Sequence, residues 1–173
     1  MSKTPINLNN KTILVTGSPG FIGANLVLRL LHEMTSGTIV SLDNMNDYYD
    51  PALKEYRLGL IEEVAKDLPA EHVFIRGSIA DKGLIDQLFE TYHFDVVVNL
   101  AAQAGVRYSI DHPDVYIESN LIGFYNILEA CRHSYDDGAA GVQHLVYASS
   151  SSVYGGNKKV PFSTDDKVDN PVS

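Results

Sequence analysis

The stretch from Thr12 to Gly23, TILVTGSPGFIG, decides the fold. Its first five residues are typical of a buried strand, three glycines follow in a GxxGxxG spacing, and a helical pattern runs from about Phe21 to Met34. A glycine turn between a strand and a helix brings bare backbone to a helix N-terminus, where free N–H groups and the helix dipole favour a phosphate. The stretch therefore predicts a dinucleotide-binding turn, a variant of the GxGxxG spacing. An ordinary tight turn is the alternative.

The rest of the chain alternates short apolar runs with longer amphipathic ones. Strands are expected at residues 38–42, 72–76, 95–100 and 142–148, and helices at 54–66, 83–92 and 113–133. Strands that are apolar throughout, separated by helices, indicate a mostly parallel sheet covered on both faces. Residues 156–173 are polar and contain two prolines, which is typical of a loop-like tail.

Composition narrows the function classes. The 173 residues are 45% hydrophobic, which is enough for one sizeable core. A net charge of −9 makes general binding of nucleic acid unexpected, and no apolar run approaches the ~20 residues of a membrane span. The lone cysteine, Cys131, cannot form an internal disulfide, so a reducing, cytoplasmic location is expected. The six histidines show no metal-ligand spacing, and no metal site is expected.

An acidic residue ends the second expected strand. Asp43 lies about 20 residues beyond Gly23, where dinucleotide-binding folds place the carboxylate that accepts hydrogen bonds from ribose hydroxyls. The same carboxylate repels a 2′-phosphate, and its neighbours Leu42 and Asn44 supply no arginine to hold one. The sequence therefore favours NAD over NADP. A solvated turn residue is the alternative for an acid at a strand end.

Two later strand ends carry small or hydroxyl side chains. Residues 99–103, NLAAQ, leave room for a cofactor at the carboxyl edge of the sheet, or serve only a close helix–sheet contact. Residues 149–152, SSSS, offer hydroxyls to a sugar, or form only a polar turn, since no GxSxG pattern surrounds them. Asn120 stands in the expected helix 113–133 and needs a partner, either backbone or cofactor.

Together these segments resemble the extended short-chain dehydrogenase/reductase family of nucleotide-sugar epimerases and dehydratases. Residues 43–50 (DNMNDYYD), 101–109 (AAQAGVRYS) and 149–155 (SSSSVYG) look most like those of the UDP-glucuronate 4-epimerases in that family. The resemblance covers essentially the whole chain. It implies an NAD-dependent epimerase acting on a UDP-sugar through a 4-keto intermediate, or another nucleotide-sugar epimerase or dehydratase. Family members are often homodimers, so a homodimer is also expected.

The resemblance also implies site residues. Those expected to bind the cofactor are Gly17, Gly20, Phe21, Ile22 and Gly23 for the pyrophosphate, Asp43, Asn44 and Lys54 for the adenosine ribose, Ile79 for adenine, and Leu100, Ala101, Ala102 and Asn120 for the cofactor path and its support. Ser150 matches the family's catalytic Ser/Thr beside the reacting hydroxyl. Ser151, Ser152 and Arg107 would face the substrate. Ser78 departs from the acidic residue that the family usually has beside adenine.

The family's catalytic tyrosine and lysine, a Tyr-x-x-x-Lys pair, are expected to be absent, because the resemblance places them just beyond Ser173. Tyr154 is interpreted as a structural tyrosine of the family. We therefore expect one α/β domain over residues 1–173, a doubly wound parallel sheet of Rossmann type with strand order 3-2-1-4-5. It is expected to be truncated before the last strands and the substrate domain, and inactive alone. The alternatives are an NAD-binding module without catalysis, an NADP-dependent reductase and a truncated, non-functional remnant.

Overall fold

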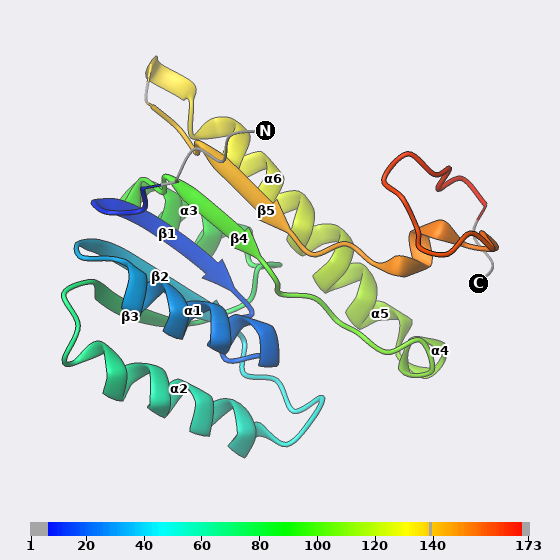
Figure 1. Cartoon of the computed structure of the whole chain (residues 1–173), viewed down its shortest axis with the longest axis horizontal. Helices are drawn as coiled ribbons and strands as arrows, with labels where there is room; N and C mark the ends of the chain where they lie inside the picture. The colour runs from blue at the N-terminus through cyan, green and yellow to red at the C-terminus, as the bar shows by residue number, and fades with distance from the viewer. Residues whose placement is uncertain (1–6, 139, 171–173) are drawn as a thin grey trace.

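Five parallel strands form one sheet in the order β3-β2-β1-β4-β5 (Figure 1). The computed structural model describes residues 7–138 and 140–170. The strands are β1 (Lys11–Thr16), β2 (Gly37–Asp43), β3 (Glu71–Arg76), β4 (Val96–Asn99) and β5 (His144–Tyr147). The predicted fold class and strand order are both confirmed.

Four helices cover the two faces of the sheet. They are α1 (Phe21–Glu33), α2 (Pro51–Ala65), α3 (Lys82–Tyr92) and α6 (Phe124–His133). Helices α1 and α2 pack together on one face, and α3 and α6 pack together on the other. Within the described residues, no helix is long and apolar enough to cross a lipid bilayer.

The core has two layers because side chains alternate along each strand. Leu14 on β1 points to the layer under α3 and α6, whereas its neighbours Ile13 and Val15 point to the layer under α1 and α2. All three are at most 1% exposed. Burial on both faces is why these strands are apolar throughout.

The long helix expected over residues 113–133 is interrupted. The structure has α4 (Tyr108–Asp111), α5 (Pro113–Tyr116), a π-helical turn η1 (Ile117–Gly123) and then α6. His112, with φ −132° and ψ 59°, separates α4 from α5, because the residue before a proline is disfavoured in helical geometry. The π-helical turn holds Asn120, whose side chain binds a neighbouring loop. The helical run starts at Pro113 and ends at His133 as expected, so periodicity alone missed the π-helical turn within it and the separate short helix α4 before it.

Residues 156–170, in the segment expected to be a loop-like tail, contain turns and bends without helix or strand, and residues 171–173 lie outside the described residues. The described part of the tail follows the short 3-10 turn η3 (Ser151–Tyr154) and lies away from the sheet (Figure 1). A second 3-10 turn, η2 (Asp136–Gly138), follows α6. The last two strands along the chain, β4 and β5, are shorter than the expected 95–100 and 142–148. Asp95, just before β4, uses its carboxylate to accept hydrogen bonds from the Thr12 amide and the Lys11 ammonium, both at 2.9 Å.

The single cysteine is part of the core, and its thiol is expected to be unreactive in the folded chain. Burial raises the pKa of Cys131 from 9.0 to about 11. Only the thiolate is nucleophilic, so iodoacetamide at neutral pH should label Cys131 in urea-unfolded chain and leave folded chain unlabelled over the same time. Because the unfolded thiol loses its proton first, the free energy of unfolding should fall as pH rises from about 9 to about 11. Equal labelling rates in the two states would contradict this.

Candidate functional site

The turn between β1 and α1 admits only glycine at three positions. Gly17 has φ +70°, and a Cβ there would lie 2.8 Å from the Ala101 nitrogen and 2.9 Å from the Leu100 carbonyl carbon. A Cβ on Gly20 would lie 2.9 Å from the Gly17 oxygen, and one on Gly23 would overlap that same oxygen. The three glycines therefore let β1, α1 and the end of β4 meet as bare backbone.

This turn is suited to an anion. Gly20 is the N-cap of α1 and provides no side-chain cap, so the first-turn N–H groups are available to a ligand. Ser18, also in the turn, is fully buried, and its Oγ is the one buried side-chain oxygen or nitrogen without a hydrogen-bond partner among the described residues. A dinucleotide pyrophosphate fits these features. Phe21 and Ile22 project outward and are 74% and 64% exposed.

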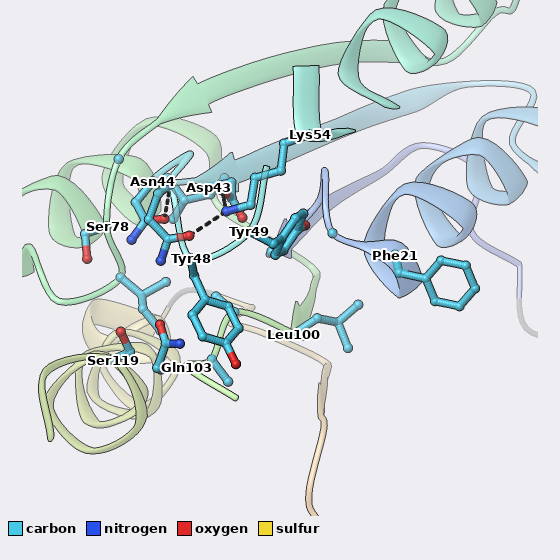
Figure 2. Close-up of a pocket in the computed structure, with 18 residues that line it drawn as sticks. Phe21, Asp43, Asn44, Tyr48, Tyr49, Lys54, Ser78, Leu100, Gln103 and Ser119 are labelled. Atoms are coloured by element: carbon cyan, nitrogen blue, oxygen red, sulfur yellow. Dashed lines mark hydrogen bonds and ion pairs between the residues drawn. The ribbon is translucent and has the colours of Figure 1, made fainter. Parts of the chain in front are cut away.

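A cavity of about 190 Å³ opens at the carboxyl ends of β1 to β4 (Figure 2). Parallel α/β sheets bind ligands at this edge. Of the residues expected to bind the cofactor, the cavity brings together Gly17, Gly20, Phe21, Asp43, Asn44, Lys54, Ile79, Leu100, Ala101 and Ala102. Ile22, Gly23 and Asn120 lie outside its lining: Gly23 packs against the turn, and Asn120 acts on a loop of the cavity wall.

The acid at the end of β2 belongs to a buried ion pair. Asp43 Oδ1 accepts hydrogen bonds from the Met45 amide at 2.7 Å and from the Lys54 ammonium at 3.2 Å, with the two charged side chains 10% and 6% exposed. Lys54 also donates to Asn46 Oδ1 at 2.8 Å. Both of these hydrogen bonds go to Oδ1, so Asp43 Oδ2 can accept a further hydrogen bond. No sequence pattern pairs these two residues, because the loop 44–50 brings them together.

The side of the cavity that includes Ile79, the residue expected at adenine, is formed by the segments that follow β2 and β3. Ser78 lines the cavity, and its Oγ accepts a hydrogen bond from the Ala80 amide at 3.1 Å. Ile79 also lines it but is only 5% exposed, because its side chain packs against Gly123 in η1. Ile79 therefore offers a small apolar surface to a ring. Asn44 Oδ1 accepts a hydrogen bond from the Asn46 amide at 3.1 Å, which shapes the loop after β2.

The wall after β4 is held by a side chain from the π-helical turn. Asn120 Oδ1 accepts a hydrogen bond from the Gln103 amide at 2.8 Å, and Asn120 Nδ2 donates to the Gln103 carbonyl at 2.9 Å. Of the two partners considered for Asn120, the structure shows the backbone. Thr16 Oγ1 likewise accepts from the Ala101 amide at 3.1 Å. The backbone of residues 101–103 is thus fixed from both sides.

Asn120→Ala is expected to loosen this wall, because it removes a donor and an acceptor at once. The free energy of unfolding should fall by about 1–3 kcal/mol, and the Gln103 amide should exchange its hydrogen faster. Asn120→Asp keeps the acceptor for the Gln103 amide and should restore part of that amide's protection against hydrogen exchange. Urea unfolding and amide hydrogen exchange measure the two effects. Unchanged exchange at Gln103 in the alanine variant would contradict this role.

The residues expected at the substrate lie outside the cavity lining. Ser150 is exposed and is the N-cap of η3, where its Oγ accepts a hydrogen bond from the Ser152 amide at 3.1 Å. Ser151 and Ser152 lie in η3, and Arg107 is exposed just before α4. These side chains follow β4 and β5 on the carboxyl edge that holds the cavity. In this structure the serine run is a polar turn.

The spacing Tyr-x-x-x-Lys does occur in the chain, at Tyr154 and Lys158. The expectation that the chain contains no such spacing was therefore wrong. The structure does not arrange these two residues as a helical pair, because η3 ends at Tyr154 and Gly155 has φ +53°. The Tyr154 ring stacks on Phe162 with centroids 4.5 Å apart. Neither Tyr154 nor Lys158 lines the cavity.

Several cavity residues were missed by sequence reasoning. They are Leu42, Asn46, Tyr48, Tyr49, Gly77 and Ser119, and Gln103 was considered only as part of the segment 99–103. Tyr48 and Tyr49 belong to the DYYD segment, which alone did not distinguish a functional loop from a turn. A usable signal was its position directly after β2, at the ligand-binding edge. Within residues 7–138 and 140–170, no three His, Cys, Asp or Glu side chains are placed to hold a metal ion.

The strand order, the glycine turn and the acid at the end of β2 define a Rossmann-type dinucleotide-binding domain. The family model described as GDP-mannose 4,6 dehydratase matches residues 14–173. The chain therefore belongs to this family of NAD-dependent nucleotide-sugar epimerases and dehydratases, which confirms the resemblance drawn from its motifs.

Three similar proteins illustrate the relationship. UDP-glucuronate 4-epimerase 4 of Arabidopsis thaliana is 45% identical over 166 residues, which are 95% of this chain and 35% of that protein. UDP-glucose 4-epimerase of Thermus thermophilus, solved with NAD, is 31% identical with a TM-score of 0.65, covering 89% of this chain and 42% of that one. UDP-glucose-4-epimerase of Stenotrophomonas maltophila, solved with NAD and formylated UDP-arabinopyranose, is 25% identical with a TM-score of 0.71, covering 91% and 42%. The chain spans less than half the length of the curated relatives that it matches.

Proposed function

We propose that this chain is the NAD-binding half of a nucleotide-sugar 4-epimerase, with UDP-glucuronate as the favoured substrate. The observation that carries the proposal is the cavity itself, which joins the glycine turn, Asp43 and the small residues after β4 at one edge of the sheet. The sugar preference rests on the 45% identity to an Arabidopsis thaliana UDP-glucuronate 4-epimerase.

The described residues have clear roles in holding the cofactor. The first-turn N–H groups of α1 would bind the pyrophosphate, and Asp43 Oδ2 would accept hydrogen bonds from the adenosine ribose. Ala101 and Ala102 leave space for the dinucleotide to pass β4. When bound, NAD supplies a reversible hydride acceptor. Orientation by the chain is what makes such a transfer efficient.

The acid–base step needs a proton acceptor beside the sugar. Ser150 would orient a sugar hydroxyl from the end of β5, with Ser151, Ser152 and Arg107 near the remainder of the substrate. We place the tyrosine and lysine of the catalytic pair in the part of the relatives that this chain does not cover. Tyr154 and Lys158 are the alternative pair, disfavoured because they share no helical turn and lie outside the cavity lining.

An NAD-binding module without catalysis is a second candidate. The single observation that favours it is the position of Ser150 in a polar turn outside the cavity lining. Such a module would bind NAD and ignore sugar nucleotides.

A homodimer and a cytoplasmic location also remain proposals. Supporting the dimer, an exposed apolar surface follows η1 and α6, where Leu121, Tyr125 and Leu128 are 62%, 56% and 41% exposed. Contiguous exposed apolar surface of this kind commonly marks an interface.

The test combines binding with turnover. The purified chain is titrated with NAD and incubated with NAD and UDP-glucuronate, and the 4-epimer is sought by chromatography. The product of the same gene read past codon 173 is assayed in parallel. We expect the chain to bind NAD without turnover and the longer product to epimerise. Turnover by the chain that Tyr154→Phe abolishes would reassign the base to Tyr154, and a longer product that binds NAD but not UDP-sugars would support the module.

A further inference from the structure

Two loops approach each other across the cofactor cavity. The loop of residues 44–50 follows β2, and the loop of residues 100–107 follows β4. Strand β1 and its glycine turn lie between these two strands in the sheet. A side chain that joins the loops therefore passes across the mouth of the cavity, in front of the turn proposed to hold the pyrophosphate.

Tyr48 is that side chain. It comes from the loop after β2, lines the cavity, and extends toward the side of Leu100 and Gln103 (Figure 2). Its ring meets the ring of Tyr108, at the start of α4, edge-on with centroids 4.9 Å apart. Its hydroxyl lies so close to Gly105 that a Cβ on that glycine would overlap it. Gly105 also has φ +98°, a backbone conformation that residues with a Cβ rarely adopt. Both the close approach of Tyr48 and the backbone conformation therefore require glycine at this position.

The receiving loop is held firmly. The Tyr116 hydroxyl lies 2.7 Å from the Ala104 carbonyl oxygen and also against the Gly105 carbonyl oxygen, so its one proton is shared between these two acceptors. Asn120 binds the backbone of Gln103 in both directions. Tyr108 also packs against His112, with ring centroids 4.4 Å apart. Tyr48 thus docks onto a preorganised surface, whereas its own loop, at residues 47–49, is a bend without helix or strand.

We propose that Tyr48 and Tyr108 form a strap that closes over the bound dinucleotide and must separate before it leaves. The inference rests on the proposed cofactor site and adds a function for the DYYD segment. Both rings act as positioning residues: Tyr108 contributes through Tyr48 and lies outside the cavity lining. The strap therefore sets the rate of cofactor release.

Release is measured by loading the chain with NADH and displacing it with excess NAD in a stopped-flow fluorimeter. Tyr48→Ala and Tyr108→Ala should each raise the release rate about three- to tenfold, the range expected for one aromatic pair. The double variant should be no faster than the faster single variant, because either change opens the same strap. Tyr48→Phe keeps the ring contact and should release NADH at nearly the parent rate. Tyr56→Ala, an exposed tyrosine on α2 outside the cavity lining, is the matched control and should change nothing.

Two results would overturn the strap. If Tyr108→Ala leaves the release rate unchanged, or if the effects of the single variants multiply in the double variant, Tyr48 acts as an independent ligand contact. A ligand-free measurement separates this from failure of the cofactor site: amide hydrogen exchange at residues 44–50 should speed up in Tyr108→Ala, because that loop loses the ring on which Tyr48 docks. Unchanged exchange there refutes the strap even if no dinucleotide binds, whereas lack of NADH binding by the parent chain refutes the cofactor site.

Discussion

Gly23→Ala is expected to abolish dinucleotide binding and to destabilise the fold at once. The added Cβ would overlap the Gly17 carbonyl oxygen and lie 2.8 Å from the Ser18 Cα, and both neighbours are backbone that cannot rotate away. To relieve the overlap, α1 must move off the glycine turn, which displaces the N–H groups that would hold the pyrophosphate. Overpacking of this kind costs about 3 kcal/mol, or roughly 6–12 °C in the thermal midpoint for a chain of this size. NAD affinity should fall at least ~100-fold, since several hydrogen bonds to one anion are misplaced together.

Gly59→Ala is the matched control, because it makes the same change in a helix where nothing lies within 4 Å of the new Cβ. Alanine favours helix over glycine by about 1 kcal/mol, so this variant should melt slightly higher and bind NAD unchanged. Calorimetric titration with NAD and thermal unfolding followed by circular dichroism give both quantities for both variants. If Gly23→Ala bound NAD as tightly as the parent, the glycine turn would not be the pyrophosphate site.

Asp43→Ala is expected to cost both stability and cofactor selectivity. It leaves the Lys54 ammonium, 6% exposed, with Asn46 as its remaining hydrogen-bond partner. Removing one member of a buried ion pair costs about 3 kcal/mol or more. It also removes the ribose acceptor and the negative charge that opposes a 2′-phosphate. NAD affinity should drop about 10- to 100-fold, while NADP affinity should fall less or rise.

Lys54→Met tests the other half of the pair and should shift selectivity in the opposite direction. Lys54 offsets the Asp43 charge, so without it the carboxylate should repel the 2′-phosphate more strongly, and the preference for NAD over NADP should increase. Asp43→Asn with Lys54→Met in one chain removes both charges and should be more stable than Asp43→Ala. Urea unfolding and competitive binding of the two cofactors measure these effects. If Asp43→Ala and Lys54→Met shifted the preference for NAD over NADP in the same direction, the two charges would not have opposing roles.

Much of the fold was predictable because its determinants are local. The apolar strands and the glycine turn at residues 17–23 are contiguous in sequence, and the resemblance they support fixed the strand order. The π-helical turn was not predictable from periodicity, because η1 bulges where Asn120 reaches the Gln103 backbone 17 residues away. That contact depends on the path of the loop after β4.

The candidate site was partly predictable for the same reason. Asp43 and the glycines occupy fixed places in a strand–turn–helix pattern, and the structure brings Asp43, Gly17 and Gly20 to one cavity. The burial of Lys54 against Asp43 and the crossing of Tyr48 to Tyr108 depend on how loop 44–50 folds back, which no periodic pattern encodes. The Tyr154–Lys158 spacing shows the converse: a motif in the sequence is not a site when a glycine with positive φ interrupts the helix that it needs.

Calorimetric titration of the purified 173-residue chain with NAD, followed by NADP, tests the central claim most directly. We expect one NAD site per chain and weaker binding of NADP, with Gly23→Ala abolishing the NAD signal. Absence of NAD binding by a chain that unfolds cooperatively, or tighter binding of NADP than NAD, would contradict the claim that this domain is the NAD-binding half of a nucleotide-sugar epimerase.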